Sequence, residues 1–285
     1  MIPTRAPANT KLDLNAAWDQ AVRLMALNRE VVLVLTGVFF FLPHVLFLLL
    51  VPIPDFSGLA GPSGETTPAL MAAVRGFIAD YWWAAALLAV VQTAGGTSVM
   101  AVVGDPARPT VGEAVRRGGA FLLSSVGAQV LTTLATTLAL FLAILLGALT
   151  GSRTVAGTLA VFALPVIVWL MTRLSLSGAS IAIERIPNPV AALRRSWRLT
   201  GGNGLRLVFF YVLLFAAFFV ISQVIGLLIG LVTALPGAEL AAILGAVLSG
   251  AVYSVLIAVG FAVISSVHRQ LARAERVSVP VSHEV

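Results

Sequence analysis

The chain contains six long runs without a charged residue, and these runs constrain its fold more than any other feature. They cover residues 31–54, 81–104, 118–152, 154–172, 207–238 and 240–267, and the fourth continues more weakly to 183. A helix that crosses a lipid bilayer needs about 20 consecutive apolar residues. Because 59% of the residues are apolar and only 11% are charged, too few polar side chains are present to cover a water-soluble globule. We therefore expect an all-α, polytopic membrane bundle of six transmembrane helices.

The basic residues lie almost entirely on one side of these six runs. Of the 18 Lys and Arg residues, all except Arg75, Arg153 and Arg173 precede the first run, separate the second from the third or the fourth from the fifth, or follow the sixth. Loops rich in Lys and Arg remain in the cytoplasm. This pattern predicts a multi-pass protein of the bacterial inner (plasma) membrane with both termini cytoplasmic. The net charge of +6 then favours contact with anionic lipid headgroups rather than with nucleic acid, since no soluble basic domain is recognisable.

Three short basic segments, at residues 15–25, 110–119 and 188–203, each precede a pair of apolar runs. At helical spacing these segments have an apolar stripe and a polar flank, which is typical of a helix lying flat on a membrane surface. Thr110 with Glu113 forms a capping-box pattern at the start of the second segment. The residues expected to contact lipid or a protein partner are Trp18, Arg23, Arg116, Arg117, Arg194, Arg195, Trp197 and Arg198.

The same segments divide the chain, which we expect to form one membrane domain over residues 1–285, into pseudo-repeats of roughly 11–104, 105–183 and 184–276. Each repeat consists of a cytoplasmic interfacial amphipathic helix followed by a transmembrane hairpin, and the three are expected around a pseudo-threefold axis along the membrane normal. A simpler explanation also stays open, because any cytoplasmic loop beside a membrane tends to be basic and amphipathic. Residues 53–80, rich in Pro, Gly and Ser, are expected to form an external loop.

Polar side chains within or at the ends of the apolar runs are the candidates for a site inside the membrane. They are His44, Gln92, Gln129, Gln223, Arg173 and Glu184. His44 follows Pro43 and is either a functional group or a neutral histidine hydrogen-bonded between helices. Arg173 is expected near the inner boundary, where surface anchoring is its predicted role. Glu184 either pairs with Arg173 or with an arginine of residues 194–198, or it is a solvated loop carboxylate. The glutamines either hold helices together or line a polar path.

The segment from Arg173 to Arg206 resembles part of a bacterial six-span membrane family. The residues that match are Glu184, Pro189, Ala192, Arg195-Ser196-Trp197, Leu199-Thr200 and Gly202. They resemble the signature of the membrane domain of glycerophosphoryl diester phosphodiesterases and of the related YciC-like inner-membrane proteins. Some members of that family fuse the membrane domain to a soluble phosphodiesterase barrel, and no such barrel is recognisable here. The resemblance therefore implies a stand-alone membrane module.

The sequence offers little for catalysis or for metal binding. It has no cysteine, and its histidines, His44, His268 and His283, lie far apart without an H-E-x-x-H pattern. Metal-dependent hydrolysis of phosphodiesters needs several clustered ligands. We therefore expect no enzymatic activity, no cofactor and no metal.

Two functions from different classes remain. The favoured one is an integral membrane module that engages anionic lipid headgroups, or a membrane or cytoplasmic protein partner, at the cytoplasmic face. The alternative is a small transporter or channel with a polar path between the hairpins. Transporters usually contain helix breaks near the middle of the membrane, and only Gly95-Gly96 and Pro165 suggest such breaks here.

Overall fold

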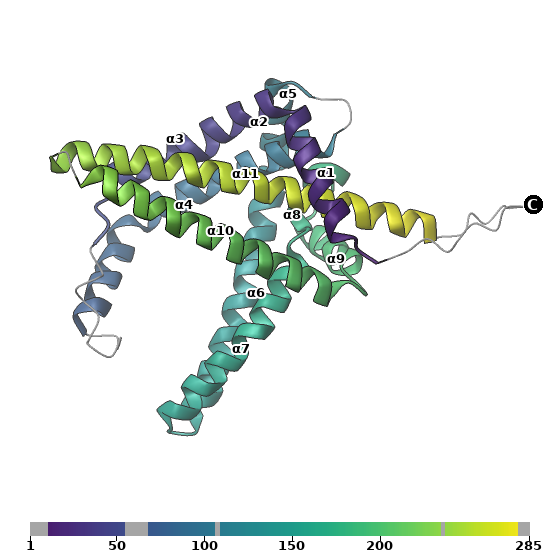
Figure 1. Cartoon of the computed structure of the whole chain (residues 1–285). Coiled ribbons are helices and arrows are strands. Elements are labelled where there is room, and N and C mark those ends of the chain that lie inside the picture. Colours follow the sequence, from purple (N-terminus) through teal and green to yellow (C-terminus); the bar gives the residue numbers. More distant parts are fainter. Residues whose placement is uncertain (1–10, 55–67, 106–108, 235–236, 279–285) are drawn as a thin grey trace, which may run out of the picture.

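The chain folds into helices of very unequal length, joined by short turns (Figure 1). The computed structural model describes residues 11–54, 68–105, 109–234 and 237–278. The helices are α1 (Leu14–Leu27), α2 (Arg29–Thr36), the π-helix η1 (Gly37–Phe41), α3 (Leu42–Leu50), α4 (Pro68–Gly104), α5 (Val111–Ala120), α6 (Leu122–Leu149), α7 (Arg153–Leu174), α8 (Ser177–Glu184), α9 (Pro189–Leu199), α10 (Gly204–Thr233) and α11 (Ala238–Ser278).

Six stretches of helix are long and apolar enough to cross a membrane, as the sequence predicted. They are Arg29–Leu50, Pro68–Gly104, Leu122–Leu149, Thr154–Glu184, Gly204–Thr233 and Ala238–Val277. The regular secondary structure of the described residues is thus entirely helical, and its six long apolar stretches are compatible with a multi-pass membrane protein.

The predicted external loop over residues 53–80 is wrong in its second half. Helix α4 begins at Pro68 and continues without interruption to Gly104. Proline is well tolerated at the start of a helix, where its missing N–H is not needed, and the Ala-, Leu- and Met-rich residues after it favour helix. Arg75 and Asp80 interrupt the apolar run but not the helix, because charged residues are compatible with an exposed helical surface. Residues 55–67 lie outside the described part of the chain.

Helix α4 also passes through Gly95-Gly96 without the break that the transporter alternative suggested. A Cβ atom on Gly95 would lie 2.3 Å from Cβ of Phe39, and one on Gly96 would lie 2.6 Å from Cζ of Phe261. The two glycines therefore give space to aromatic side chains of η1 and α11 that pack directly on the α4 backbone. The α7 helix likewise continues through Pro165.

Helices α4 and α11 are at the centre, and the other long helices lie around them. Helix α11 packs against α1, α3, α4 and α10, whereas α4 packs against α2, α5, α6 and α8. In the most apolar stretch of α4 half of the residues are buried, but in that of α10 none is. Helices α6 and α7 run side by side and project away from the rest of the molecule (Figure 1). The six long stretches are therefore not equivalent in their surroundings.

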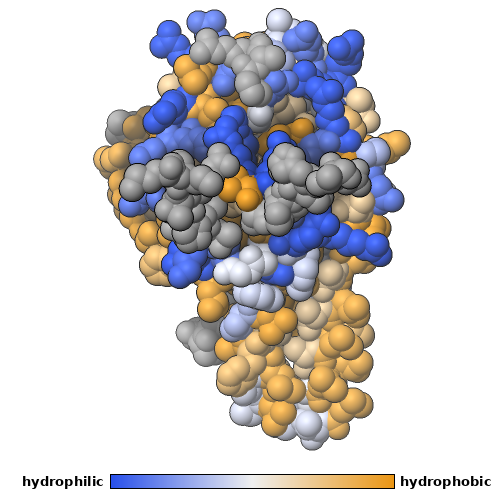
Figure 2. Space-filling view, turned by 90° about the vertical axis from the view of Figure 1, so that its right-hand side faces the viewer, coloured by the Kyte–Doolittle hydropathy of each residue, from blue (hydrophilic) through white to orange (hydrophobic). Residues whose placement is uncertain are grey.

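The short helices α1, α5 and α9 gather at one end of the molecule. Helix α1 lies on α11, where Ser266 donates a buried hydrogen bond of 2.7 Å to the carbonyl oxygen of Ala17. The predicted capping box of Thr110 and Glu113 at the start of α5 is confirmed. Helix α5 crosses α4 so closely that a Cβ atom on Gly118 would lie 2.0 Å from Oγ of Ser98. Figure 2, which views this end, shows hydrophilic residues gathered here and hydrophobic residues on the projecting α6–α7 pair.

The first long stretch widens into a π-helix just before its proline. The N–H of Leu42 donates to the carbonyl oxygen of Gly37, five residues earlier, instead of to the one four residues earlier. Because Pro43 has no N–H to donate, a local π-helix is one of the known ways for a helix to accommodate the disruption. The ring of His44 follows directly and faces α11.

Candidate functional site

An ion-pair network joins α8, α9 and α11 at the end where the short helices gather. Glu184 accepts two hydrogen bonds from Arg195, one from Nε at 2.8 Å and one from Nη2 at 3.0 Å. Arg195 also donates through Nη1 to Glu275 on α11, whose other carboxylate oxygen lies 3.2 Å from Nε of Arg198. Of the three possibilities left open for Glu184, the structure shows pairing with an arginine of residues 194–198, and the partner is Arg195.

Of the two arginines of this network, Arg195 is the more withdrawn from solvent. Its side chain is 12% exposed, compared with 69% for that of Arg198. Burial alone would lower the pKa of Arg195, but the hydrogen bonds and charges of Glu184 and Glu275 outweigh it and raise that pKa. Arg195 thus fastens α9 to α8 and α11 and does not project outward from the flank of α9.

A basic pocket of about 470 Å³ lies beside the network. Its ionisable lining residues are Glu184, Arg195, His268, Arg269, Arg273 and Arg276. Arg269, Arg273 and Arg276 are spaced four and three residues apart on α11, so they share one face of the helix. Among the described residues no acidic side chain forms an ion pair with Arg273 or Arg276. The pocket therefore has an excess of positive charge.

His268 is buried in the wall of this pocket. Its residue surface is 1% exposed, and its Nε2 lies 3.1 Å from Oε1 of Glu184. Nε2 is thus within ion-pair distance of Glu184, whereas Nδ1 has no hydrogen-bond partner among the described residues. Sequence reasoning missed this residue because it treated the end of the sixth run as a simple basic flank. The spacing of His268, Ala272 and Arg276 at intervals of four could have identified a single helical face.

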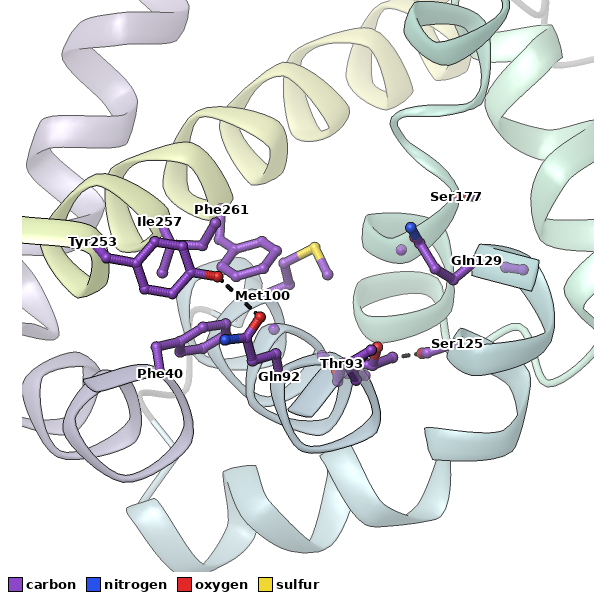
Figure 3. Close-up of a pocket in the computed structure, with 15 residues that line it drawn as sticks. Phe40, Gln92, Thr93, Met100, Ser125, Gln129, Ser177, Tyr253, Ile257 and Phe261 are labelled. Carbon is purple, nitrogen blue, oxygen red and sulfur yellow. Dashed lines mark hydrogen bonds between the residues drawn. The ribbon is translucent and has the colours of Figure 1, made fainter. Parts of the chain in front are cut away.

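A second hollow, the polar cavity, lies between α4, α6, α8 and α11 and has a volume of about 270 Å³ (Figure 3). Its polar lining residues are Gln92, Thr93, Thr97, Ser125, Gln129, Ser177 and Tyr253. Two hydrogen bonds cross between helices in its wall: Tyr253 Oη donates to Gln92 Oε1 at 2.9 Å, and Thr97 Oγ1 donates to Ser125 Oγ at 2.9 Å.

The predicted intramembrane candidates meet only in part. Gln92 and Gln129 both line the polar cavity. The ring of His44 stacks on Tyr253 of the same cavity, with centroids 4.4 Å apart and planes inclined by 17°. Gln223 is exposed on α10 and does not line the cavity. Sequence reasoning gave no weight to Tyr253, which links His44 to Gln92.

The predicted role of Arg173 as a surface anchor is wrong. The residue is 8% exposed, and its guanidinium carbon lies 5.4 Å from the ring centroid of Trp169 and 4.4 Å from that of Trp197. Cation–π contacts of this kind stabilise a guanidinium that has left water. Its carbonyl oxygen also accepts a hydrogen bond of 2.7 Å from Ser196. Arg173 therefore joins the end of α7 to α9 instead of reaching outward.

The remaining candidates lie on the short helices. Trp18, Arg23, Arg116 and Arg194 are exposed. Arg117 forms an ion pair of 2.5 Å with Asp105. Among the described residues no group of three or more His, Asp or Glu side chains could hold a metal ion.

Comparison with known proteins identifies a family but no activity. No curated protein and no solved structure matches the chain. Residues 12–271 match one family model, described as a domain of unknown function, DUF7847. That match covers Glu184, Arg195 and Arg198 of the network, α11 as far as residue 271 and the whole polar cavity, and it ends before Arg273, Glu275 and Arg276. The chain belongs to the family of the domain of unknown function DUF7847.

Proposed function

We propose that this protein is a non-enzymatic module of the bacterial inner membrane that binds the phosphate of an anionic phospholipid headgroup in the basic pocket. The observation that carries this proposal is the set of three arginines, Arg269, Arg273 and Arg276, on one face of α11 and against a cavity of about 470 Å³. A volume of this size lies within the range of about 300–1,000 Å³ that is usual for ligand sites.

The charge of the pocket supports an anionic ligand. Arg195 and Arg198 are balanced by Glu184 and Glu275, so the positive charge of the other arginines is left in excess. Arginine binds phosphate oxygens through paired, charge-assisted hydrogen bonds. The buried His268 adds a ring nitrogen without a partner among the described residues. A phosphate group would satisfy these groups together.

The position of the pocket supports a lipid as the source of that phosphate. The pocket lies at the same end as α1, α5 and α9, which we propose are interfacial helices on the cytoplasmic surface, each preceding a transmembrane hairpin. Trp18 and Trp197, 40% and 43% exposed, suit the headgroup level of a bilayer. Both termini are then cytoplasmic, as the distribution of basic residues predicts.

The test compares two triple variants that lose the same charge. Arg269, Arg273 and Arg276 are changed together to Gln in one, and the exposed Arg23, Arg116 and Arg194 in the other. The full chain is reconstituted in nanodiscs that contain phosphatidylglycerol and phosphatidylcholine, and the lipid retained after detergent extraction is measured by native mass spectrometry. With about 1 kcal/mol for each arginine, the pocket variant should retain phosphatidylglycerol roughly 100-fold more weakly.

The control variant removes arginines that can contact headgroups only from the open surface of α1, α5 and α9, so it should lose clearly less phosphatidylglycerol than the pocket variant does. Equal losses in both variants would reduce the effect to general surface charge and refute the pocket as the site. Inorganic phosphate is added in a parallel series. If it displaces phosphatidylglycerol at equal concentration, the ligand is free phosphate rather than a headgroup.

One observation favours the transporter alternative. The polar cavity and the basic pocket are lined by the same helices, α4, α8 and α11. Flux of radiolabelled phosphate into proteoliposomes, abolished in the pocket variant, would support this alternative. Kinship with the membrane domain of glycerophosphoryl diester phosphodiesterases stays a prediction from the segment between Arg173 and Arg206.

A further inference from the structure

The polar cavity differs in chemistry from the basic pocket. None of its lining residues bears a charge at neutral pH. Amide and hydroxyl groups alternate there with the apolar side chains of Phe40, Met100, Ile257 and Phe261. A buried anion without a positive partner is strongly disfavoured. The lining therefore suits an uncharged molecule that is partly polar and partly apolar.

The depth of the cavity places it inside the hydrocarbon layer. Its lining residues on α4 extend from Ala89 to Met100, and this helix ends at Gly104 beside the basic pocket. At 1.5 Å per residue, the cavity lies about 6 to 22 Å from that end. The hydrocarbon core of a bilayer is about 30 Å thick. With the basic pocket at the headgroup level, the cavity lies mainly in the cytoplasmic half of the bilayer.

An apolar plug separates the two hollows. It consists of Met100, Ala101, Ala179 and Ala182, all at most 6% exposed. The partly buried side chains of Ile183, Phe261 and Ile264 pack against this plug. Ions from the basic pocket have no polar route through these groups. A ligand of the polar cavity therefore does not enter through the basic pocket.

On one side of the cavity, α6 diverges from α4 and α11 (Figure 1). Gln129 on α6 is an exposed residue and at the same time lines the cavity, so it marks the opening (Figure 3). The long helices on this side, α6 and α7, are 6% buried in their most apolar stretches. Acyl chains can lie along such surfaces while a small polar head enters the cavity.

We propose that the polar cavity binds the head of an uncharged lipid with a free hydroxyl group, of the diacylglycerol class. The hydroxyl of Tyr253 donates a hydrogen bond to Oε1 of Gln92, so the amide N–H groups of Gln92 can donate to an ester carbonyl of the ligand. Gln129 forms no hydrogen bond to another described side chain or backbone group, and its amide can both donate to and accept from a hydroxyl. A volume of about 270 Å³ accommodates the glycerol head and excludes the acyl chains.

The proposal is tested with a diacylglycerol that has a photoactivatable diazirine in one acyl chain. The full chain is reconstituted in phosphatidylcholine nanodiscs, irradiated, digested and mapped by mass spectrometry. A phosphatidylcholine with the same labelled chain is the comparison probe. Diacylglycerol should label peptides of α4, α6 and α11 around the cavity at least about fivefold more than phosphatidylcholine does. Equal labelling by the two probes, or labelling elsewhere only, would overturn the proposal.

Two glutamine variants form a matched pair. Gln129→Leu removes an amide at the opening without breaking a hydrogen bond between helices, and Gln223→Leu removes an exposed amide of α10 outside the cavity. Loss of one or two hydrogen bonds to the ligand should lower diacylglycerol labelling about three- to tenfold in Gln129→Leu, whereas Gln223→Leu should label as the unaltered chain does. Both variants should melt at the same temperature. Unchanged labelling in Gln129→Leu contradicts the proposed site.

A third variant tests occupancy of the cavity itself. Thr93→Leu adds an apolar group to the lining, and the threonine hydroxyl that it removes donates only to a carbonyl oxygen of its own helix. Diacylglycerol labelling should fall at least about fivefold without loss of thermal stability. The arginine variant of the basic pocket should keep full diacylglycerol labelling, so failure of the headgroup proposal and failure of this one are distinguishable.

Discussion

Replacing Arg195 by Gln should destabilise the protein more than the same change at the neighbouring Arg198. Arg195 makes three hydrogen bonds to two carboxylates from a side chain that is 12% exposed. Removing one partner of a fully buried ion pair costs about 3–5 kcal/mol, and an exposed pair contributes less than about 1 kcal/mol. The side chains of Glu184 and Glu275 are 19% and 34% exposed, so the cost of removing Arg195 should lie between these two limits. After the substitution, Glu184 still has His268 as a neighbour and Glu275 still has Arg198.

We therefore expect Arg195→Gln to lower the free energy of unfolding by about 2–3 kcal/mol, which is roughly a 30- to 140-fold change in the folding equilibrium. Arg198→Gln, at a side chain that is 69% exposed, should lower it by less than about 1 kcal/mol. Reversible unfolding in mixed detergent micelles, followed by circular dichroism, measures both. A difference between the two variants smaller than about 0.5 kcal/mol would refute the view that Arg195 fastens α9 to the bundle.

Three further outcomes follow from packing and topology. Gly118→Ala should destabilise the protein by about 1–3 kcal/mol, because the new methyl group would overlap α4, whereas Gly119→Ala meets open space and should be neutral or slightly stabilising; thermal melting separates them. Ser266→Ala removes a buried hydrogen bond to α1 and should cost about 1 kcal/mol, with faster amide hydrogen exchange throughout α1. Because the chain has no cysteine, Arg194→Cys should react with a membrane-impermeant maleimide only in inverted vesicles and Gly237→Cys only in right-side-out vesicles; labelling of both from one side contradicts the proposed topology.

The six long apolar helical stretches could be predicted from the sequence because their signal is local. A run of about 20 apolar residues without charge has few other structures open to it. The capping box at Thr110 and Glu113 is local in the same way, since both partners lie within one helical turn. The start of α4 at Pro68 was missed because Arg75 and Asp80 interrupt the apolar run and Pro68 suggests a turn, although none of them interrupts the helix.

The candidate site depended on contacts between distant segments, and there the sequence was less informative. The pairing of Glu184 with Arg195 was one of several open possibilities, and the two residues, in α8 and α9, are only 11 positions apart in the sequence. Glu275 and His268, from α11, complete the network across some 80 residues of sequence. Neither residue could be placed there without knowledge of how α11 packs.

The misjudged role of Arg173 has a different physical reason. An arginine near the end of an apolar run is expected to extend toward water, because a lone guanidinium is costly to bury. Trp169, one helical turn earlier, and Trp197, from α9, together provide aromatic faces that offset this cost. The second of these rings is supplied by tertiary structure alone, so the periodicity of the run could not reveal it.

Buried residues are concentrated at the end where the short helices gather. The contacts made there, including the ion-pair network, hold the long helices together. In lipid, apolar side chains gain little by leaving acyl chains for one another, so packing and polar contacts decide how membrane helices associate. The most apolar stretches of α6, α7 and α10 have 6% or fewer of their residues buried. The largest buried cluster instead joins α1, α2, α4, α9 and α11 near the ion-pair network. The α6–α7 pair is thus held at one end and diverges from the other long helices (Figure 1), and the polar cavity lies where α6 leaves α4 and α11.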